Sequence, residues 1–128
     1  MERKIVKTDK APAALGPYSQ AVVVGDFVFT SGQLPLDPKT GALVGKDITS
    51  QTTQVFENLK AVLEATGSSL KNIVKANVFL ANMNDFAEMN KVYSKYCEGA
   101  AFGARAAMEV KSLAKKALVE IDLVATLN

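Results

Sequence analysis

Hydrophobic residues recur with two different periods along the chain, and the shorter period predicts β-strands. Residues 20–24 and 27–31 are rich in Val, Phe and Thr and flank Gly25-Asp26, which predicts a β-hairpin with a two-residue turn. Other short β-prone segments cover residues 3–7, 72–81, 105–110 and 117–125. The pattern therefore predicts a sheet of five or six strands.

The longer period predicts two helices. Residues 48–66 carry apolar side chains three or four positions apart, with Asp47 or Thr49 available as an N-cap and Gly67 available at the end. Asn84 is the predicted N-cap of a second helix. Its apolar side chains follow the same spacing at Phe86, Met89, Tyr93 and Cys97.

The order of these elements predicts a single α/β (α+β) domain over residues 1–128. No internal repeat or Pro/Gly/Ser-rich linker divides the chain. Two amphipathic helices can cover only one face of a five- or six-stranded sheet. Because strands such as residues 21–24 are apolar at consecutive positions, the second face is also expected to be partly buried, and this favours a homo-oligomer.

Composition and charge disfavour several classes of protein, among them nucleic-acid-binding, secreted and membrane-spanning proteins. Hydrophobic residues make up 48% and charged residues 22% of the chain, which is typical of a globular protein. A net charge of +2 with scattered lysines disfavours nucleic acid as the main partner. The amino end does not resemble a signal peptide, and no apolar run reaches the length of a membrane span. A cytoplasmic location is therefore expected.

The chain contains no histidine and only one cysteine. This excludes Ser-His-Asp and Cys-His catalysis and disfavours the usual zinc sites. Cys97 has no basic neighbour in sequence, so a role as a small core residue is favoured over a role as a nucleophile. Any catalysis must use carboxylates, Arg, Lys, Tyr, Ser or backbone groups.

Arg105 and Glu120 are the main candidates for chemistry. An arginine fork can bind a substrate carboxylate, and a partly desolvated glutamate can orient or deprotonate water. Alternation along residues 117–125 places Glu120 opposite the main apolar stripe of its strand. If residues 105–110 and 117–125 form a hairpin, the two side chains lie at a similar height on neighbouring strands. Spacing alone favours a simple Arg–Glu salt bridge.

Further candidates lie at turns and on the second helix. Tyr18 follows Gly16-Pro17, and a place in a cleft or at the rim of the sheet is equally compatible with this turn. Ser31-Gly32 follows a strand, where a glycine permits close approach of a ligand, but the sequence alone favours a bulge at the strand end. Asn90 lies on the apolar stripe of its helix, which favours hydrogen bonds to backbone groups over ligand contact.

Six segments in order resemble the RidA (YjgF/YER057c/UK114) family. They are A-P-A-A-L-G-P-Y-S-Q at 11–20, S-G-Q-L-P-L-D-P at 31–38, Q-V-F-E-N-L-K-A-V-L-E at 54–64, N-V-F-L at 77–80, D-F-A-E-M-N-K-V-Y at 85–93 and A-L-V-E-I at 117–121. The resemblance implies a chorismate-mutase-like (YjgF-like) fold with a mixed sheet and a homotrimer with clefts between subunits. It also implies 2-iminobutanoate/2-iminopropanoate deaminase activity, which needs no cofactor or metal. The imines derive from enamines made by pyridoxal-phosphate-dependent dehydratases, and the products are 2-keto acids and ammonia.

By the same resemblance, Arg105 binds the substrate carboxylate, Glu120 positions water and Tyr18 lines the cleft. The remaining substrate-binding positions implied are Ser31, Gly32, Asn90 and the backbone of Ala107. The chain departs from the family pattern at Gly103, where a proline is usual, and this predicts a freer backbone beside the arginine.

Three other functions are compatible with the same residues. The first is a non-catalytic regulator that binds keto acids or amino acids in the same cleft. The second is an RNA-acting translation inhibitor or endoribonuclease, which the absence of histidine and the small net charge disfavour. The third is a chaperone-like or structural trimer, which would make Arg105 and Glu120 dispensable.

Overall fold

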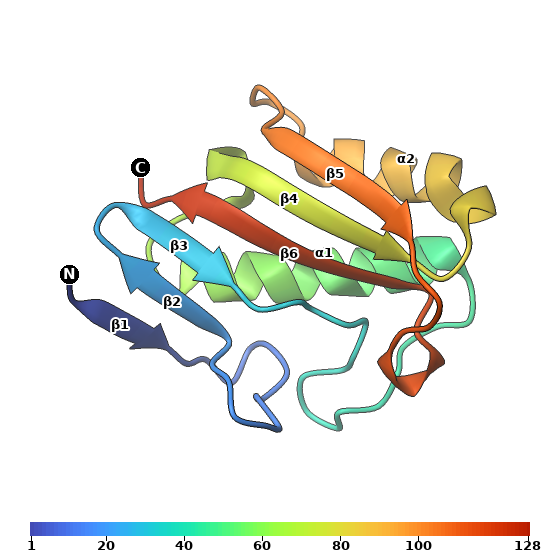
Figure 1. The fold of residues 1–128 in the computed structure, drawn as a ribbon, viewed down its shortest axis with the longest axis horizontal. Coiled ribbons are helices and arrows are strands. Elements are labelled where there is room, and N and C mark those ends of the chain that lie inside the picture. The colour runs from blue at the N-terminus through green and yellow to red at the C-terminus, as the bar shows by residue number, and fades with distance from the viewer.

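The computed structural model describes residues 1–128, and it has two layers, one of strands and one of helices (Figure 1). The main elements are β1 (Arg3–Val6), β2 (Ala21–Val24), β3 (Phe27–Thr30), α1 (Ile48–Glu64), β4 (Ile73–Leu80), α2 (Phe86–Tyr96), β5 (Ala104–Glu109) and β6 (Val119–Thr126). Short 3-10 helices occupy Leu70–Asn72 (η1), Met83–Asp85 (η2) and Ala114–Lys116 (η3). The predicted order of strands and helices is confirmed.

All six strands form one mixed sheet in the order β1-β2-β3-β6-β4-β5. The predicted β2–β3 hairpin is present, and Gly25 at its turn has a φ of +57°. The hairpin considered for residues 105–110 and 117–125 is wrong, because β4 lies between β5 and β6. After α2, the chain returns to the sheet beside β4 and parallel to it, as βαβ crossovers do. Residues 110–118 then carry the chain past β4 to the antiparallel position of β6.

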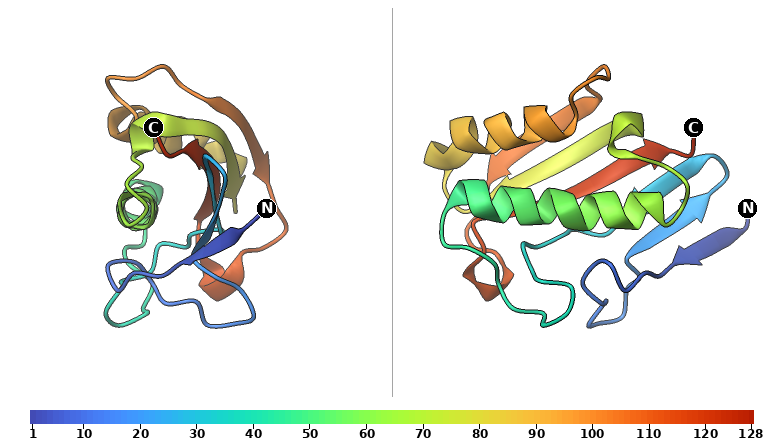
Figure 2. Two further views of the ribbon diagram at one scale, coloured as in Figure 1. Left: turned by 90° about the vertical axis from the view of Figure 1, so that its left-hand side faces the viewer. Right: turned by 180° about the vertical axis from the view of Figure 1, so that it is seen from behind.

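Both helices cover the same face of the sheet, as the sequence predicts (Figure 2). Asp47 is the N-cap of α1, and its carboxylate accepts a hydrogen bond from the Ser50 backbone N–H at 2.8 Å. Complete burial of an aliphatic or phenyl side chain contributes about 1.5–3 kcal/mol. The fully buried apolar side chains of α1 are Val55, Phe56, Leu59, Val62 and Leu63.

The predicted N-cap of the second helix is wrong. Asn84 lies inside the 3-10 helix η2, and its backbone N–H donates to the side chain of Asn82 at 2.8 Å. Three residues that favour N-cap positions occur here within four positions, namely Asn82, Asn84 and Asp85. The first of them, Asn82, is the N-cap of η2. The chain then continues through η2 into α2 at Phe86.

The face of the sheet turned away from the helices, here called the open face, carries large apolar side chains. The strand register places Ile5, Phe29 and Met108 on it, and each is at least 36% exposed. No second layer of the chain covers this face (Figure 2). Neither helix is long and apolar enough to cross a membrane.

Gly103, at which the sequence predicts a freer backbone beside Arg105, packs closely against β4. Its Cα lies directly against β4, and an added Cβ would come 2.5 Å from the carbonyl oxygen of Ile73 and 2.8 Å from that of Val74. The missing side chain therefore allows β5 to begin in close contact with its neighbouring strand.

Gly103→Ala is expected to destabilise the fold by about 1–3 kcal/mol, because a rigid backbone cannot move aside for the new methyl group. Thermal unfolding measures this change. Gly16→Ala is the matched control, since its Cβ would meet only the exposed side chain of Tyr18. Equal unfolding temperatures for the two variants would contradict the close packing of Gly103.

Candidate functional site

Arg105 lies on the helix side of the sheet, where α2 holds its guanidinium group. The register aligns it with Ala76 of β4, whose side chain is fully buried beneath the helices. Its Nη1 donates a 2.7 Å hydrogen bond to Oδ1 of Asn90. The guanidinium carbon lies 5.4 Å from the ring centre of Phe86 and 4.9 Å from that of Tyr93.

The three α2 residues that hold Arg105 occupy positions i, i+4 and i+7, which form one stripe of a helix. Tyr93 is itself fixed, because its ring packs edge-on against Phe56 with centroids 5.2 Å apart. Burial raises the pKa of Tyr93 to about 12, so the ring stays neutral beside the cation. Cation–π contacts and one hydrogen bond orient the guanidinium. Its Nε and Nη2 donors have no partner in the chain and can bind a carboxylate.

Ala107 lies on the same strand, and β5 is an edge strand with one free row of backbone groups. The Val110 N–H donates to the Leu80 carbonyl at 2.9 Å. Successive N–H groups of a strand point in opposite directions, so the N–H of Ala107, three residues earlier, points to the free edge. This group is available to a ligand near Arg105.

Glu120 lies on the open face and is the second residue of β6. Its carboxylate is packed against Gly32 so closely that an added Cβ would overlap its Oε2 atom. Burial, together with the charge of the nearby Asp122, raises the pKa of Glu120 above the usual value of 4.5. Asp122 is fixed by a 2.9 Å hydrogen bond from Nδ2 of Asn77. The Glu120 carboxylate therefore packs against Gly32 and binds a proton more readily than an exposed glutamate.

Hydrogen bonds connect Ser31 to the segment that follows Tyr18. The Ser31 hydroxyl donates to the backbone carbonyl of Ser19 at 2.5 Å, and its N–H donates to that of Gln20 at 2.9 Å. Tyr18 precedes these residues, and its side chain is 54% exposed. The structure thus places Gly32, with its neighbour Ser31, beside Glu120 and not beside Arg105. The Tyr18 hydroxyl instead accepts a 3.4 Å hydrogen bond from the Leu15 backbone N–H.

The candidate residues therefore form two groups on opposite faces of the sheet. Arg105 with Asn90 faces the helices, whereas Glu120 faces away from them, and β4 lies between their strands. Two strand spacings alone separate them by roughly 10 Å. Since the one ion pair of the chain joins Lys91 to Glu88, the Arg105–Glu120 salt bridge favoured by spacing is wrong within a single chain.

The sequence did not identify three residues that contact or influence the candidate side chains. They are Phe86 and Tyr93, which hold Arg105, and Asp122, whose charge acts on Glu120. The first two were available from their helical spacing around Asn90, and Asp122 from its place two residues after Glu120 on the same face of the strand. Asn90 was expected to bond backbone groups, but its partner is the Arg105 side chain. Cys97 is confirmed as a core residue, and burial raises the pKa of its thiol to about 11. No three His, Cys, Asp or Glu side chains converge on a position that could hold a metal ion.

Comparison with known proteins gives the family. The sequence profile described as Endoribonuclease L-PSP matches residues 8–127. The chain belongs to the RidA (YjgF) family. It is 50% identical to a RutC family protein of Pyrococcus abyssi over 98% of both chains. It is 46% identical to the 2-iminobutanoate/2-iminopropanoate deaminase of Salmonella typhimurium, over 95% of this chain and 96% of the relative.

A solved structure of a RidA family relative supports the same fold. The crystal structure of Escherichia coli TdcF with bound serine has a TM-score of 0.92 and 40% sequence identity to this chain, and covers 96% of this chain and 98% of its own. A six-stranded sheet with two helices is therefore the fold of this chain.

Gly32→Ala is expected to destabilise the protein by about 1–3 kcal/mol, because the new methyl group overlaps the Glu120 carboxylate. Chemical denaturation of a double-mutant cycle measures this interaction. In a Glu120→Ala background the same glycine substitution should cost at least about 0.5 kcal/mol less. Additive effects would contradict direct packing of Gly32 on Glu120.

The raised pKa of Glu120 predicts a pH-dependent effect of Glu120→Gln. A raised folded-state pKa means that the stability contribution is fully present below about pH 4.5 and is lost as the pH rises through the folded-state pKa. Glu120→Gln should therefore raise the unfolding temperature by a few degrees at about pH 8 and leave it unchanged at about pH 4. The exposed Glu98→Gln should shift it at neither pH. An equal shift at both pH values would contradict the assignment.

Proposed function

We propose that this protein is a cytoplasmic 2-iminobutanoate/2-iminopropanoate deaminase that hydrolyses small 2-imino acids to 2-keto acids and ammonia. The observation that carries the proposal is Arg105, whose guanidinium is held by Asn90 and two aromatic rings with its Nε and Nη2 donors free. A fork of this kind suits a planar carboxylate. The 46% identity to a deaminase of that name supports the same substrate class.

In the proposed mechanism, Arg105 and the backbone N–H of Ala107 bind the substrate carboxylate. Glu120 takes a proton from a water molecule, and the water oxygen adds to the carbon of the protonated imine. Tyr18 or a backbone group stabilises the addition product, a carbinolamine. Glu120 returns this proton to the nitrogen and accepts the hydroxyl proton of the carbinolamine as the C–N bond breaks. Ammonia and the 2-keto acid leave, and Glu120 releases the remaining proton to solvent. Because protonated imines already react with water, orientation of the two reactants supplies most of the required acceleration.

This mechanism requires two copies of the chain, since Arg105 and Glu120 lie on opposite faces of one sheet. We propose a homotrimer in which the β5 region of one copy meets the open face of the next near Glu120. The apolar side chains on the open face and the free edge of β5 both support an association of this kind. Ser31, Gly32 and Tyr18 would then line the cleft from the side of Glu120.

Arg105→Ala is expected to lower kcat/KM for the imine by about a hundredfold, since charge-assisted hydrogen bonds contribute roughly 1.5–3 kcal/mol each. A threonine dehydratase generates 2-iminobutanoate in the assay, and release of 2-ketobutyrate is followed. Arg3, the other arginine of the chain, provides the matched control Arg3→Ala. An Arg105→Ala protein as fast as the unaltered protein would overturn the assignment, and light scattering shows whether each variant keeps its oligomeric state.

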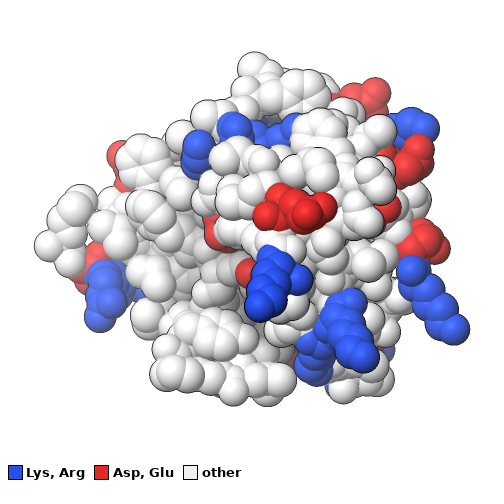
Figure 3. All heavy atoms as spheres, turned by 45° about the vertical axis from the view of Figure 1, so that its right-hand side comes forward, with Lys and Arg blue, Asp and Glu red and all other residues white.

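A second candidate function is a binding protein for amino acids or keto acids that does not turn them over. The TdcF structure with bound serine favours it. Serine has a carboxylate, which the Arg105 guanidinium of this chain could bind. This function predicts that serine or 2-ketobutyrate stabilises the protein against heat while the imine hydrolyses at its background rate. On the face drawn in Figure 3, basic side chains are interspersed with acidic ones, so this face offers the RNA-acting alternative no continuous basic surface.

A further inference from the structure

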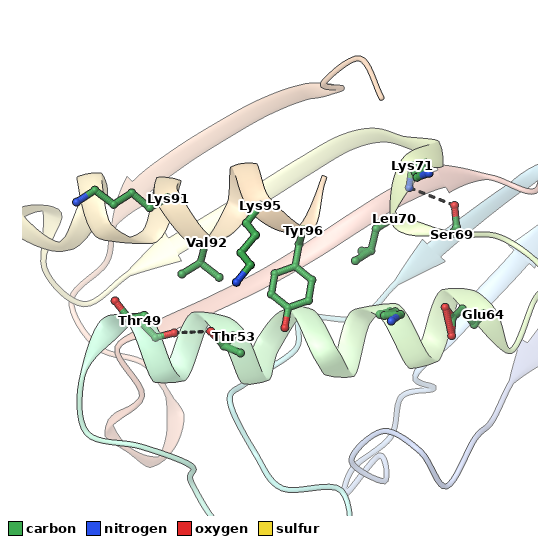
Figure 4. A pocket seen from close by; sticks show the side chains of 11 residues that line it. Thr49, Thr53, Glu64, Ser69, Leu70, Lys71, Lys91, Val92, Lys95 and Tyr96 are labelled. Carbon is green, nitrogen blue, oxygen red and sulfur yellow. Dashed lines mark hydrogen bonds between the residues drawn. The ribbon is translucent and has the colours of Figure 1, made fainter. Parts of the chain in front are cut away.

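The outer surface of the helix layer contains a groove between α1 and α2 that the proposed reaction does not use (Figure 4). Its volume is about 830 Å³. The α2 residues that line it are Lys91, Val92, Lys95 and Tyr96. They lie on a different stripe of the helix from Phe86, Asn90 and Tyr93, which hold Arg105, so Arg105 and the groove contact different faces of α2.

The groove has an ordered apolar wall. Tyr96 stacks on Phe56 with ring centres 5.2 Å apart and planes inclined by 13°. Its hydroxyl donates a 2.7 Å hydrogen bond to the Glu57 carboxylate. Leu70 and Val92 also line the groove beside this ring, and each is largely buried. A partner could pack against these side chains without first ordering them.

The rim of the groove is positively charged. Four lysines line it, Lys60, Lys71, Lys91 and Lys95, together with the acidic Glu64. Two further carboxylates are bonded to lining side chains, Glu57 to Tyr96 and Glu88 to Lys91. Of the four lysines, Lys91 alone forms an ion pair, to Glu88 at 2.8 Å. The other three ammonium groups are exposed and have no acidic partner in the chain. This excess of positive charge around an apolar wall is complementary to an occupant with one acidic and one apolar face.

The shape of the groove suits an elongated occupant. Its lining extends along α1 from Thr49 to Glu64, which corresponds to roughly 22 Å of helix. The space between two packed helices can accept the side chains of a third helix. RNA fits less well, because the lining contains no arginine and one face of its single aromatic ring is already stacked on Phe56.

We propose that this lysine groove binds an acidic amphipathic helix of a partner protein, with apolar side chains against Val92 and Tyr96 and carboxylates at Lys60, Lys71 and Lys95. Binding on this surface leaves the carboxylate-binding fork of Arg105 accessible. The groove would thus couple the enzyme to another protein without blocking its proposed site.

A fluorescent helical peptide of roughly 18 residues tests the proposal, with leucine at i, i+3 and i+7 spacing and glutamate elsewhere. Anisotropy should show binding that weakens with salt, and a peptide with lysine in place of glutamate should bind at least about tenfold more weakly. The double variant Lys60→Glu with Lys95→Glu should lose at least about tenfold in affinity, and Lys60→Arg with Lys95→Arg should retain it.

The control variant Lys39→Glu with Lys116→Glu makes the same change in net charge at exposed positions that do not line the groove, and it should bind the acidic peptide normally. Equal affinity of the groove variant and the control variant would overturn the proposal. Groove-dependent binding of a single-stranded RNA oligonucleotide, without binding of the acidic peptide, would overturn it in favour of nucleic acid. Imine hydrolysis should be unchanged in both lysine variants, so this test is independent of the proposed activity.

Discussion

The parallel pairing of β5 with β4 determines where the candidate arginine lies and what can hold it. This pairing follows from the crossover through α2, which returns the chain to the sheet beneath the same helix. Arg105 therefore points toward α2, where Asn90, Phe86 and Tyr93 occupy one stripe and fix its guanidinium. The same pairing leaves one edge of β5 free, so the fork and the Ala107 N–H lie next to an unpaired strand edge.

The packing of β6 against the helices determines on which face of the sheet Glu120 lies. Alternation along β6 buries Val119 and Ile121 under the helices, so Glu120 must face the other way. Its carboxylate is half-buried against Gly32, and ionisation there opposes folding because its pKa is raised. A carboxylate at this position therefore lowers stability at neutral pH, and local breaks of this kind are the ones expected at functional sites.

Because of these two constraints, the proposed reaction and the proposed partner use different surfaces of the molecule. The open face presents Glu120 among apolar side chains such as Phe29 and Met108, and an association of copies through this face would complete the proposed site. The outer face of the helix layer presents the lysine groove and takes no part in that association. Because α2 lies between Arg105 and the groove, its two stripes serve the proposed chemistry and the proposed partner separately.

The sequence by itself determined the elements, since hydrophobic periodicity and local turn chemistry depend on near neighbours in the chain. The strand–helix order, the Gly25 hairpin and the outward face of Glu120 followed from it, and the motifs indicated the family. The tertiary structure alone decided which strands are neighbours, because a crossover and a hairpin leave similar local patterns. It therefore decided that Arg105 and Glu120 lie on opposite faces, that Asn90 bonds Arg105 and that Gly103 packs against β4. Each depends on residues distant in sequence, and no local pattern encodes their contact.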